Sequence, residues 1–268
     1  MKAWAKGRIG AVFAVAIGAA VFVGAAMIGR YEPDLAPPTR TVAPGLVRLD
    51  GAEGSRLLFE SEAHAAFLPL ISHFETQQSL VHCGPASIAM VLNALELPTP
   101  PSPAHHPYRL FTQENVLNDL TRSIIGDRAF KRHGMSLLKV AEVLRVYGAS
   151  VDMRYAGASD IDTFRTLAAE YLGRPGHQVI VTYSRTAMGQ EGGGHISPLG
   201  AYDADSDRFL ILDVSRYKAP AVWVSTQQLF MAMAKPKSVD NPQTRGFLLI
   251  HAAPDTDGDA GPVAAAPL

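Results

Sequence analysis

The chain has 268 residues and only one cysteine, Cys83. A single cysteine excludes an internal disulfide, and without cysteine pairs there is no basis for a structural zinc site. The metalloprotease motif HExxH and the EF-hand calcium loop are also missing, so no spacing of residues predicts a bound metal ion. The lone thiol is therefore either a small buried hydrophobic group, which is the more usual role, or a nucleophile.

The sequence also lacks a strong charge of either sign. Its 24 Lys and Arg residues and 25 Asp and Glu residues give a formal net charge of −1. This balance creates no field that would attract a polyanion, so no nucleic-acid partner is expected. The nine histidines are scattered, and the adjacent pair His105-His106 is interpreted as a chance surface pair in a proline-rich loop.

The apolar residues are concentrated at the N-terminus. Lys2, Lys6 and Arg8 precede an uncharged run over residues 9–28. About 20 helical residues span the ~30 Å hydrocarbon core of a membrane, whereas the apolar part of a signal peptide has roughly 7–15 residues. The preceding positive charges predict that the rest of the chain crosses the membrane. Residues 1–30 are therefore predicted to be an uncleaved signal anchor, with a cleaved signal peptide as the alternative.

The rest of the chain divides by composition into three parts. Residues 31–54 contain four prolines without hydrophobic periodicity, which is typical of an extended linker. Residues 55–252 are predicted to form one globular domain. Residues 253–268 are rich in Ala, Pro, Gly and Asp and are predicted to be a disordered tail.

Within the globular part, helical patterns come first and strand patterns second. Helical spacing of apolar residues is found in 83–95, 116–124, 137–147, 159–172 and 229–234. Runs rich in β-branched and aromatic residues, bounded by turn residues, are 151–155, 178–183, 195–202, 209–214, 221–224 and 246–251. This order predicts an α+β fold with a helical N-terminal half and an antiparallel sheet in the C-terminal half.

Cys83 is predicted to begin one of these helices. The apolar positions that follow it, within residues 88–95, recur at helical spacing, and Pro85 suits a first helical turn because its missing N–H has no intrahelical acceptor there. The positive end of the helix dipole favours a thiolate over a thiol. This position is the first argument that Cys83 is a nucleophile.

His195 and Asp213 are the candidates for its partners. They lie in two strand-like runs joined by the polar turn 203–207, at nearly equal distances from Ala204. In an antiparallel hairpin the two residues would therefore face each other across the ladder. A carboxylate in that position orients the imidazole and supports its charged form, while the other ring nitrogen faces the thiol. Taken singly, each residue has an ordinary structural role as the simpler interpretation.

Gln77 completes the candidate site. Attack of a thiolate on an amide needs donors aimed at the developing oxyanion. The Gln77 side-chain amide, six residues before Cys83, and the Cys83 backbone N–H are the predicted donors. Gln78 is the competing candidate.

The order Gln77, Cys83, His195, Asp213 resembles the papain-type cysteine peptidases, and the surrounding segments resemble phytochelatin synthase. The resemblance spans residues 65–252. The segments that carry it are Thr76–Gln77, Cys83–Ser87, Met90–Leu95, Phe111–Asn115, Gly194–Tyr202, Ile211–Lys218 and Arg245–Phe247.

What this resemblance implies is a papain-like fold and thiol-dependent acyl transfer on glutathione. Cys83 would attack the Cys–Gly bond, glycine would leave, and a γ-glutamylcysteinyl thioester would form. Water would then give γ-glutamylcysteine, and a second glutathione would give a phytochelatin. The plant enzymes carry a cysteine-rich C-terminal domain that has no counterpart in this sequence. The chain therefore looks like the short bacterial form, for which simple cleavage is expected.

The resemblance also implies which residues bind the substrate. Arg216 and Arg245 are candidates for clamping the free α-carboxylate of the γ-glutamyl group, because guanidinium matches carboxylate in a bidentate geometry. Gly194 would allow the substrate to approach the backbone closely. Asp240 is a looser candidate for the α-ammonium group, and Lys218 is interpreted as a solvated charge.

The remaining expectations follow from the resemblance to phytochelatin synthase and from the apolar run at the N-terminus. Glutathione is the expected partner, and no cofactor is required. A heavy-metal ion such as cadmium would activate the reaction only as a metal–thiolate form of the substrate. The signal anchor would place a bacterial protein in the inner membrane facing the periplasm, or in the periplasm if the segment is cleaved. The oligomeric state is open, with a homodimer as one candidate.

Two other functions fit parts of the sequence. Processing peptidases of the bacteriocin-leader type also have Gln and Cys-Gly before a helix, but they are usually fused to a transporter, and no transporter spans are found here. The second alternative is a membrane-tethered binding module with a catalytically unused papain-like fold. An inactive descendant would be expected to have lost one member of the set Cys83, His195 and Asp213, and all three are present.

Overall fold

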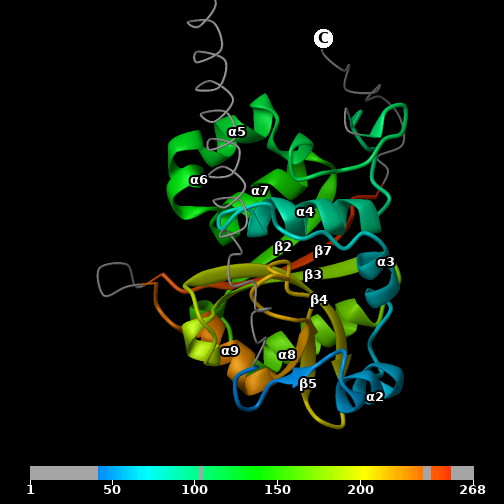
Figure 1. Ribbon diagram of the computed structural model, residues 1–268, viewed down its shortest axis with the longest axis vertical. Coiled ribbons are helices and arrows are strands. Elements are labelled where there is room, and N and C mark those ends of the chain that lie inside the picture. The colour runs from blue at the N-terminus through cyan, green and yellow to red at the C-terminus, as the bar shows by residue number, and fades with distance from the viewer. Residues whose placement is uncertain (1–41, 103–104, 238–242, 255–268) are drawn as a thin grey trace, which may run out of the picture. The chain divides into compact units, whose positions relative to one another are not determined.

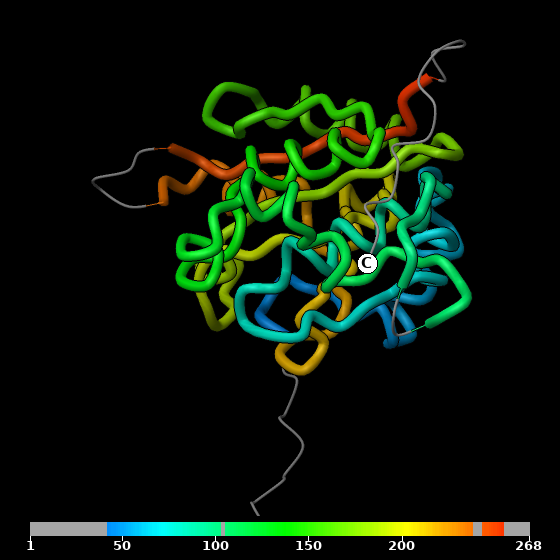
Figure 2. Tube along the Cα trace, turned by 90° about the horizontal axis from the view of Figure 1, so that it is seen from above, coloured from blue at the N-terminus to red at the C-terminus, as the bar shows by residue number. Residues whose placement is uncertain are grey.

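A seven-stranded antiparallel sheet organises residues 42–102, 105–237 and 243–254, which are the residues that the computed structural model describes (Figure 1). The strands lie in the order β1-β6-β5-β4-β3-β7-β2. Their bounds are β1 Val47–Arg48, β2 Ala149–Tyr155, β3 His177–Ser184, β4 Gly194–Asp203, β5 Arg208–Ile211, β6 Val222–Ser225 and β7 Gly246–Ala252. Figure 2, in which β7 is red, shows this late strand running beside segments from much earlier in the chain.

Helices cover both faces of the sheet. Their bounds are α2 Ala52–Glu60, α3 Phe67–Ser72, α4 Cys83–Ala94, α5 Asp119–Ile125, α6 Asp127–His133, α7 Leu137–Val146, α8 Ile161–Leu172 and α9 Thr226–Ala234, with short 3₁₀ turns η2 Asn115–Leu117, η3 Ala156–Ala158 and η4 Thr186–Met188. Helices α4 to α7 lie on one side of the sheet, and α8 and α9 lie on the other (Figure 1). The predicted α+β class is confirmed.

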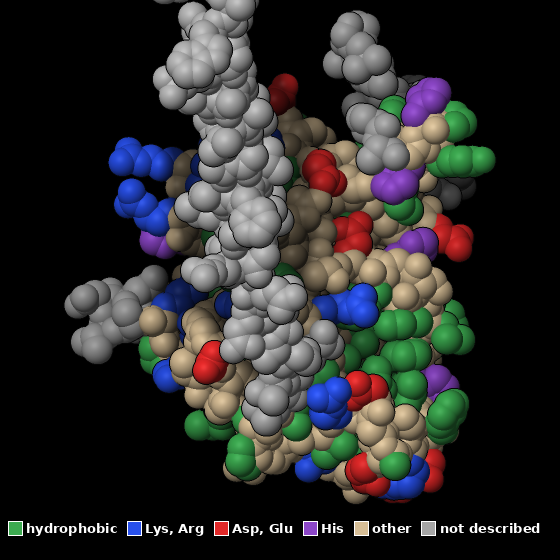
Figure 3. Space-filling model, viewed as in Figure 1, with side chains coloured by type: hydrophobic (Ala, Val, Ile, Leu, Met, Phe, Trp, Pro, Cys, Tyr) green, Lys and Arg blue, Asp and Glu red, His purple; other side chains and the backbone are tan. Residues whose placement is uncertain are grey.

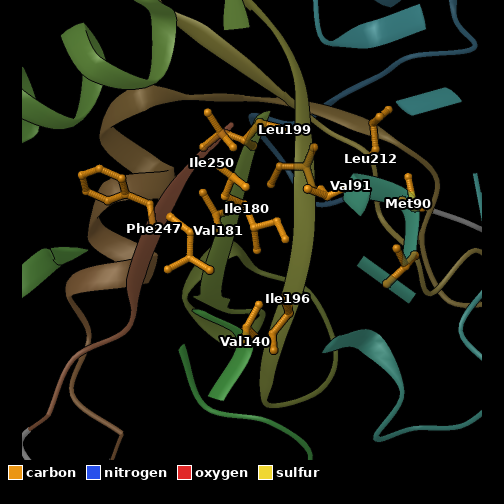
Figure 4. Close-up of a cluster of buried hydrophobic side chains, with 14 of the residues drawn as sticks. Met90, Val91, Val140, Ile180, Val181, Ile196, Leu199, Leu212, Phe247 and Ile250 are labelled. Carbon is orange, nitrogen blue, oxygen red and sulfur yellow. The ribbon is translucent and has the colours of Figure 1, made fainter. Parts of the chain in front are cut away.

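Helix α4 is at the centre of the packing. All of its residues except the last are buried. Figure 4 shows Met90 and Val91 of α4 in one cluster with Ile180 of β3 and Leu199 of β4. Each such side chain contributes about 1.5–3 kcal/mol when it is fully removed from water. The helix that begins with Cys83 is therefore held rigidly against the central strands.

Two helix boundaries differ from the sequence prediction, for local reasons. The helix expected over 116–124 is divided into η2 and α5 by Asn118, whose extended backbone ends η2 and whose side chain accepts a hydrogen bond from the Thr121 N–H at 3.0 Å. Helix α8 begins at Ile161, two residues after the predicted start at 159, because the Asp160 carboxylate caps the helix by accepting the Thr163 N–H at 2.8 Å. Helices α2, α3 and α6 are short and were not predicted.

The predicted linker 31–54 contributes to the fold in the part that the structure describes. Residues 47–48 form β1, which pairs with β6, and α2 begins at Ala52. This edge strand was not predicted because its two residues are too few to show a period, and the prolines before it favoured a linker. The predicted tail, 253–268, lies almost entirely outside the described residues.

The predicted membrane localisation is corrected here. Within the ranges that the structure describes, no helix has both the length and the apolar character needed to cross a bilayer. The run 9–28, on which the single-pass anchor in the inner membrane was based, lies outside those ranges. The structure thus gives no support for a membrane anchor.

A close backbone contact at Gly54 predicts a large loss of stability on substitution. A Cβ atom at this position would lie 1.9 Å from the carbonyl oxygen of Arg48, and the Gly54 carbonyl itself accepts a hydrogen bond from Trp223. We expect Gly54→Ala to lower the free energy of unfolding by about 3 kcal/mol, because backbone must move to admit the methyl group. Gly51→Ala, where the nearest atom is 3.5 Å away, is the matched control with a change below about 1 kcal/mol. Urea denaturation of both variants checks this; equal stabilities would contradict it.

Candidate active site

Cys83 occupies the position that the sequence predicts, the first residue of α4. Its side chain is buried, with 7% of its surface exposed, and it lines a cleft of about 560 Å³. No acidic residue lies in the first turn of α4. The thiol therefore faces the cleft from the positive end of a helix without a competing negative charge from that turn.

The structure brings His195 and Asp213 together, with His195 Nε2 2.9 Å from Asp213 Oδ1. Their relative position differs from the ladder predicted from the sequence. Leu199 pairs with Ile211, a β-bulge lies between Leu199 and Ala201, and β5 ends at Ile211. Asp213 therefore lies just beyond the strand and reaches back to the imidazole, rather than facing it directly across the sheet.

The Asp213 carboxylate is completely buried and accepts four further hydrogen bonds from three donor groups. Arg185 Nη2 donates to both carboxylate oxygens at 2.8 and 2.7 Å, and its side chain is only 4% exposed. The Tyr183 hydroxyl donates at 3.3 Å and the Ser215 N–H at 2.8 Å. A buried carboxylate with this many donors is fixed in one orientation and remains ionised.

Arg185 was missed by the sequence analysis. It follows the buried strand β3, and its N–H donates to the Gly193 carbonyl across the turn that leads into β4. The available signal was a charged residue at the end of an apolar strand that pairs with the strand of His195. A β3–β4 hairpin drawn from the sequence would have placed Arg185 close to the histidine.

Opposing effects act on the titration of the His195–Asp213 pair. Burial lowers the pKa of His195, but the charge of Asp213, the hydrogen bond to it and a hydrogen bond with Cys83 outweigh burial and raise this pKa. Burial raises the pKa of Asp213, but His195, Arg185 and the Ser215 N–H together lower it. Since Nε2 is taken by Asp213, Nδ1 is the ring nitrogen left for the thiol. The site thus stabilises an imidazolium beside Cys83.

Gln77 is placed differently from the prediction. It is buried, and its side-chain Nε2 donates to the Ser79 carbonyl and to the Tyr217 hydroxyl, both at 2.7 Å. Because a carbonyl can only accept, the atom facing Ser79 must be the nitrogen. Both N–H bonds of Gln77 are therefore committed, and the structure does not place this residue among those lining the cleft. Gln78 instead pairs with Glu114.

Only some of the substrate-binding candidates reach the cleft. Arg245 and Gly194 line it together, and a Cβ on Gly194 would lie 3.4 Å from Arg245 Nε. Arg216 is exposed and is not among the residues that line the cleft, and its guanidinium lies 5.2 Å from the centre of the Phe74 ring. Lys218 is exposed, as expected, and Asp240 lies outside the described residues.

The parts of the chain that the structure describes contain no group of three or more His, Cys, Asp or Glu side chains suited to a metal ion. The cleft instead has two histidines, one thiol and three Lys or Arg residues among its lining groups. This arrangement can activate a thiol next to a binding site for anionic ligands.

Comparison with known proteins gives consistent matches. The sequence model described as phytochelatin synthase matches residues 38–247. Glutathione gamma-glutamylcysteinyltransferase 1 of Arabidopsis thaliana is 35% identical over 78% of this chain and 42% of its own length. The Lotus japonicus protein of the same name is 36% identical, over 78% and 41%. The enzyme of Schizosaccharomyces pombe is 25% identical, over 69% and 43%.

The chain spans less than half the length of these curated relatives. The match nevertheless includes Cys83, His195 and Asp213, together with the strands and helices that position them. A family match over most of the described domain, with relatives above 30% identity, establishes descent. The chain belongs to the phytochelatin synthase family.

Proposed function

We propose that this protein catalyses thiol-dependent acyl transfer on glutathione, with Cys83 as nucleophile. The observation that carries the proposal is the hydrogen-bonded series Arg185–Asp213–His195, which ends at the only thiol of the chain inside the cleft. The relatives are named glutathione gamma-glutamylcysteinyltransferases, which supports glutathione as the substrate.

The first half-reaction forms a thioester. The Cys83 thiolate, paired with the His195 imidazolium, attacks the carbonyl carbon of the Cys–Gly peptide bond. The C–N bond then breaks, and the proton on His195 passes to the departing glycine amine. Asp213 stays ionised throughout and supports the imidazolium. The products are free glycine and a γ-glutamylcysteinyl group on Cys83.

The second half-reaction regenerates the thiolate. His195, now neutral, takes a proton from water or from the α-amine of a second glutathione as that nucleophile attacks the thioester. Water gives γ-glutamylcysteine, and glutathione gives a phytochelatin. A heavy-metal ion such as cadmium enters this step only as part of a glutathione thiolate complex, and therefore as substrate.

Arg245 and Gln77 have the remaining proposed roles toward the substrate. Arg245, beside Gly194 in the cleft, takes the α-carboxylate of the γ-glutamyl group, and Arg216 is not assigned to this role because of its contact with Phe74. The oxyanion role of Gln77 stays a prediction. It requires one N–H of the Gln77 amide to leave Ser79 or Tyr217 when substrate binds.

Neither alternative function has an observation in its favour. A leader peptidase would act on proteins, whereas the relatives are named for a reaction of glutathione. A binding module would not need the buried Arg185–Asp213 pair, because an ion pair without solvent is costly to maintain unless it performs a role.

Mass spectrometry tests the proposal directly. We expect brief exposure to glutathione to add a γ-glutamylcysteinyl group, without glycine, to Cys83, and longer incubation to release glycine in equal amount to the peptide product. Because the chain has one cysteine, protein alkylated with iodoacetamide is a specific control and should release no glycine. Absence of both adduct and glycine, with Cys83 shown to be reduced, would refute the proposed function.

A further inference from the structure

Two cations share one part of the cleft. Arg245 lies against Gly194, the neighbour of His195. Lys237 lines the same cleft and follows the end of α9, with its Nζ donating to Gln243 Oε1 at 2.8 Å. Figure 3 shows Lys and Arg side chains gathered on the side of the molecule that carries α6. Lys237 was not among the candidates found in the sequence.

Neither charge is neutralised by a described residue. The ion pairs within the described ranges do not include Lys237 or Arg245, and no Asp or Glu is among the residues that line the cleft. Arg245 Nη1 donates to the neutral Lys235 carbonyl at 3.0 Å. Burial lowers the pKa of Lys237, and the charge of Arg245 lowers it further. Two like charges held together in a cleft are stabilised when an anion binds between them.

Glutathione carries two carboxylates, one on each side of the scissile bond. Lys237 and Arg245 line the same cleft, so both can face one carboxylate of a ligand bound there. The glycine carboxylate leaves after the first half-reaction, whereas the γ-glutamyl α-carboxylate must be held through both. A pair of cations beside the backbone of Gly194 suits the part that remains attached to the enzyme.

We propose that Lys237, together with Arg245, binds the α-carboxylate of the γ-glutamyl residue and sets the affinity for the donor peptide rather than the rate of bond cleavage. This inference rests on the proposed function for the identity of the ligand. It adds to that function a specificity-determining residue that lies outside the Cys83–His195–Asp213 series.

Binding to a non-reacting form of the full chain isolates the contact. In a Cys83→Ser background, isothermal titration calorimetry with glutathione should show Kd raised roughly fivefold by Lys237→Met, because a partly exposed ion pair contributes modestly. Lys237→Arg should retain most of the affinity. Lys235→Met is the matched control: it is exposed, does not line the cleft, and contributes only its backbone carbonyl to Arg245. Its Kd should equal that of the unsubstituted background.

Two glutathione analogues identify the carboxylate. Replacing the γ-glutamyl residue with 4-aminobutanoyl removes only the α-carboxylate, and replacing glycine with glycinamide removes only the other charge. Lys237→Met should weaken the glycinamide analogue roughly fivefold and leave the aminobutanoyl analogue unchanged. An equal effect on both analogues, an effect confined to the aminobutanoyl analogue, or no effect on any ligand would overturn the inference.

The kinetics of the reactive protein separate this inference from the proposed function. In the Cys83 form, Lys237→Met should raise KM for glutathione roughly fivefold with kcat changed less than about twofold. If kcat falls and KM does not, the inference is wrong although the function stands. If unsubstituted protein binds glutathione but releases no glycine, the function fails, and the calorimetry still decides whether Lys237 contacts the α-carboxylate.

Discussion

Replacing Asp213 with asparagine is expected to lower kcat/KM for glycine release from glutathione by about 10³-fold or more. Neutralising the carboxylate that orients a catalytic histidine causes a loss of activity of this size. The carboxylate holds the His195 ring through Nε2 and accepts two contacts from Arg185 Nη2. An amide presents its NH₂ group to donors that need an acceptor. The imidazolium then loses both its charge partner and its fixed orientation.

The pH dependence of stability provides a second readout. The pKa of His195 is raised from 6.5, so the folded protein binds the proton more tightly than the unfolded chain does, and this contribution to stability is lost as pH rises above 6.5 through the raised pKa. Without the Asp213 charge, burial, the largest single effect on this pKa, is opposed only by the interactions with Cys83, so the pKa of His195 falls. The loss of stability as pH rises should therefore be smaller in Asp213→Asn than in the unsubstituted protein.

A matched substitution controls for the loss of one carboxylate charge by itself. Asp205→Asn changes an exposed carboxylate in the turn between β4 and β5, and should leave activity and the pH slope unchanged. Initial rates and urea denaturation at several pH values above 6.5 measure both quantities. Wild-type activity in Asp213→Asn, with stability unchanged, would mean that the carboxylate does not assist His195.

The sequence was sufficient for the arrangement of the elements. The apolar period after Cys83 predicted α4, and the periods in 137–147 and 229–234 predicted α7 and α9, whose N-caps Ser136 and Ser225 each accept a backbone N–H. These features depend on residues three or four apart, so local physics decides them. The short elements α3 and α6 lack enough turns to show a period.

The details of the site depend on contacts between distant residues. The hairpin argument predicted that His195 and Asp213 meet, but not the bulge beside Gly200, where added side-chain volume would lie 3.2 Å from Leu212 and Phe67. One of the two hydrogen bonds that commit the Gln77 amide is donated to the hydroxyl of Tyr217, 140 residues further along the chain. Neither a close packing contact nor a partner at that separation leaves a periodic signal.

Arg185 shows what a residue that acts through contacts with distant parts of the chain contributes to the site. It has no recognisable motif, yet its contacts with the buried Asp213 carboxylate, at 2.7 and 2.8 Å, are shorter than that of His195 at 2.9 Å. It cannot exchange for lysine without loss, because one guanidinium nitrogen reaches both carboxylate oxygens while Nη1 donates to Gln190. Removing it leaves a buried negative charge with less compensation.

We therefore expect Arg185→Met to lower the free energy of unfolding by about 3–5 kcal/mol, the cost of breaking a buried ion pair from one side. For a domain of this size that corresponds to a fall in Tm of about 10 °C. Arg216→Met is the matched control, because Arg216 is exposed and contacts only the Phe74 ring among the interactions described; its change should stay below about 1 kcal/mol.

Activity distinguishes a positioning role of Arg185 from a purely structural one. Below the melting transition, Arg185→Met should retain folded protein but release glycine about 10²-fold more slowly, since an unclamped Asp213 no longer fixes the ring of His195. Arg185→Lys should restore much of the stability through its charge and less of the rate, because an ammonium group lacks the second nitrogen that bonds Gln190 and therefore holds Asp213 less rigidly. If the lysine variant recovers rate and stability in parallel, Arg185 acts on the fold alone; if rate lags behind stability, the guanidinium sets the orientation on which the nucleophile depends.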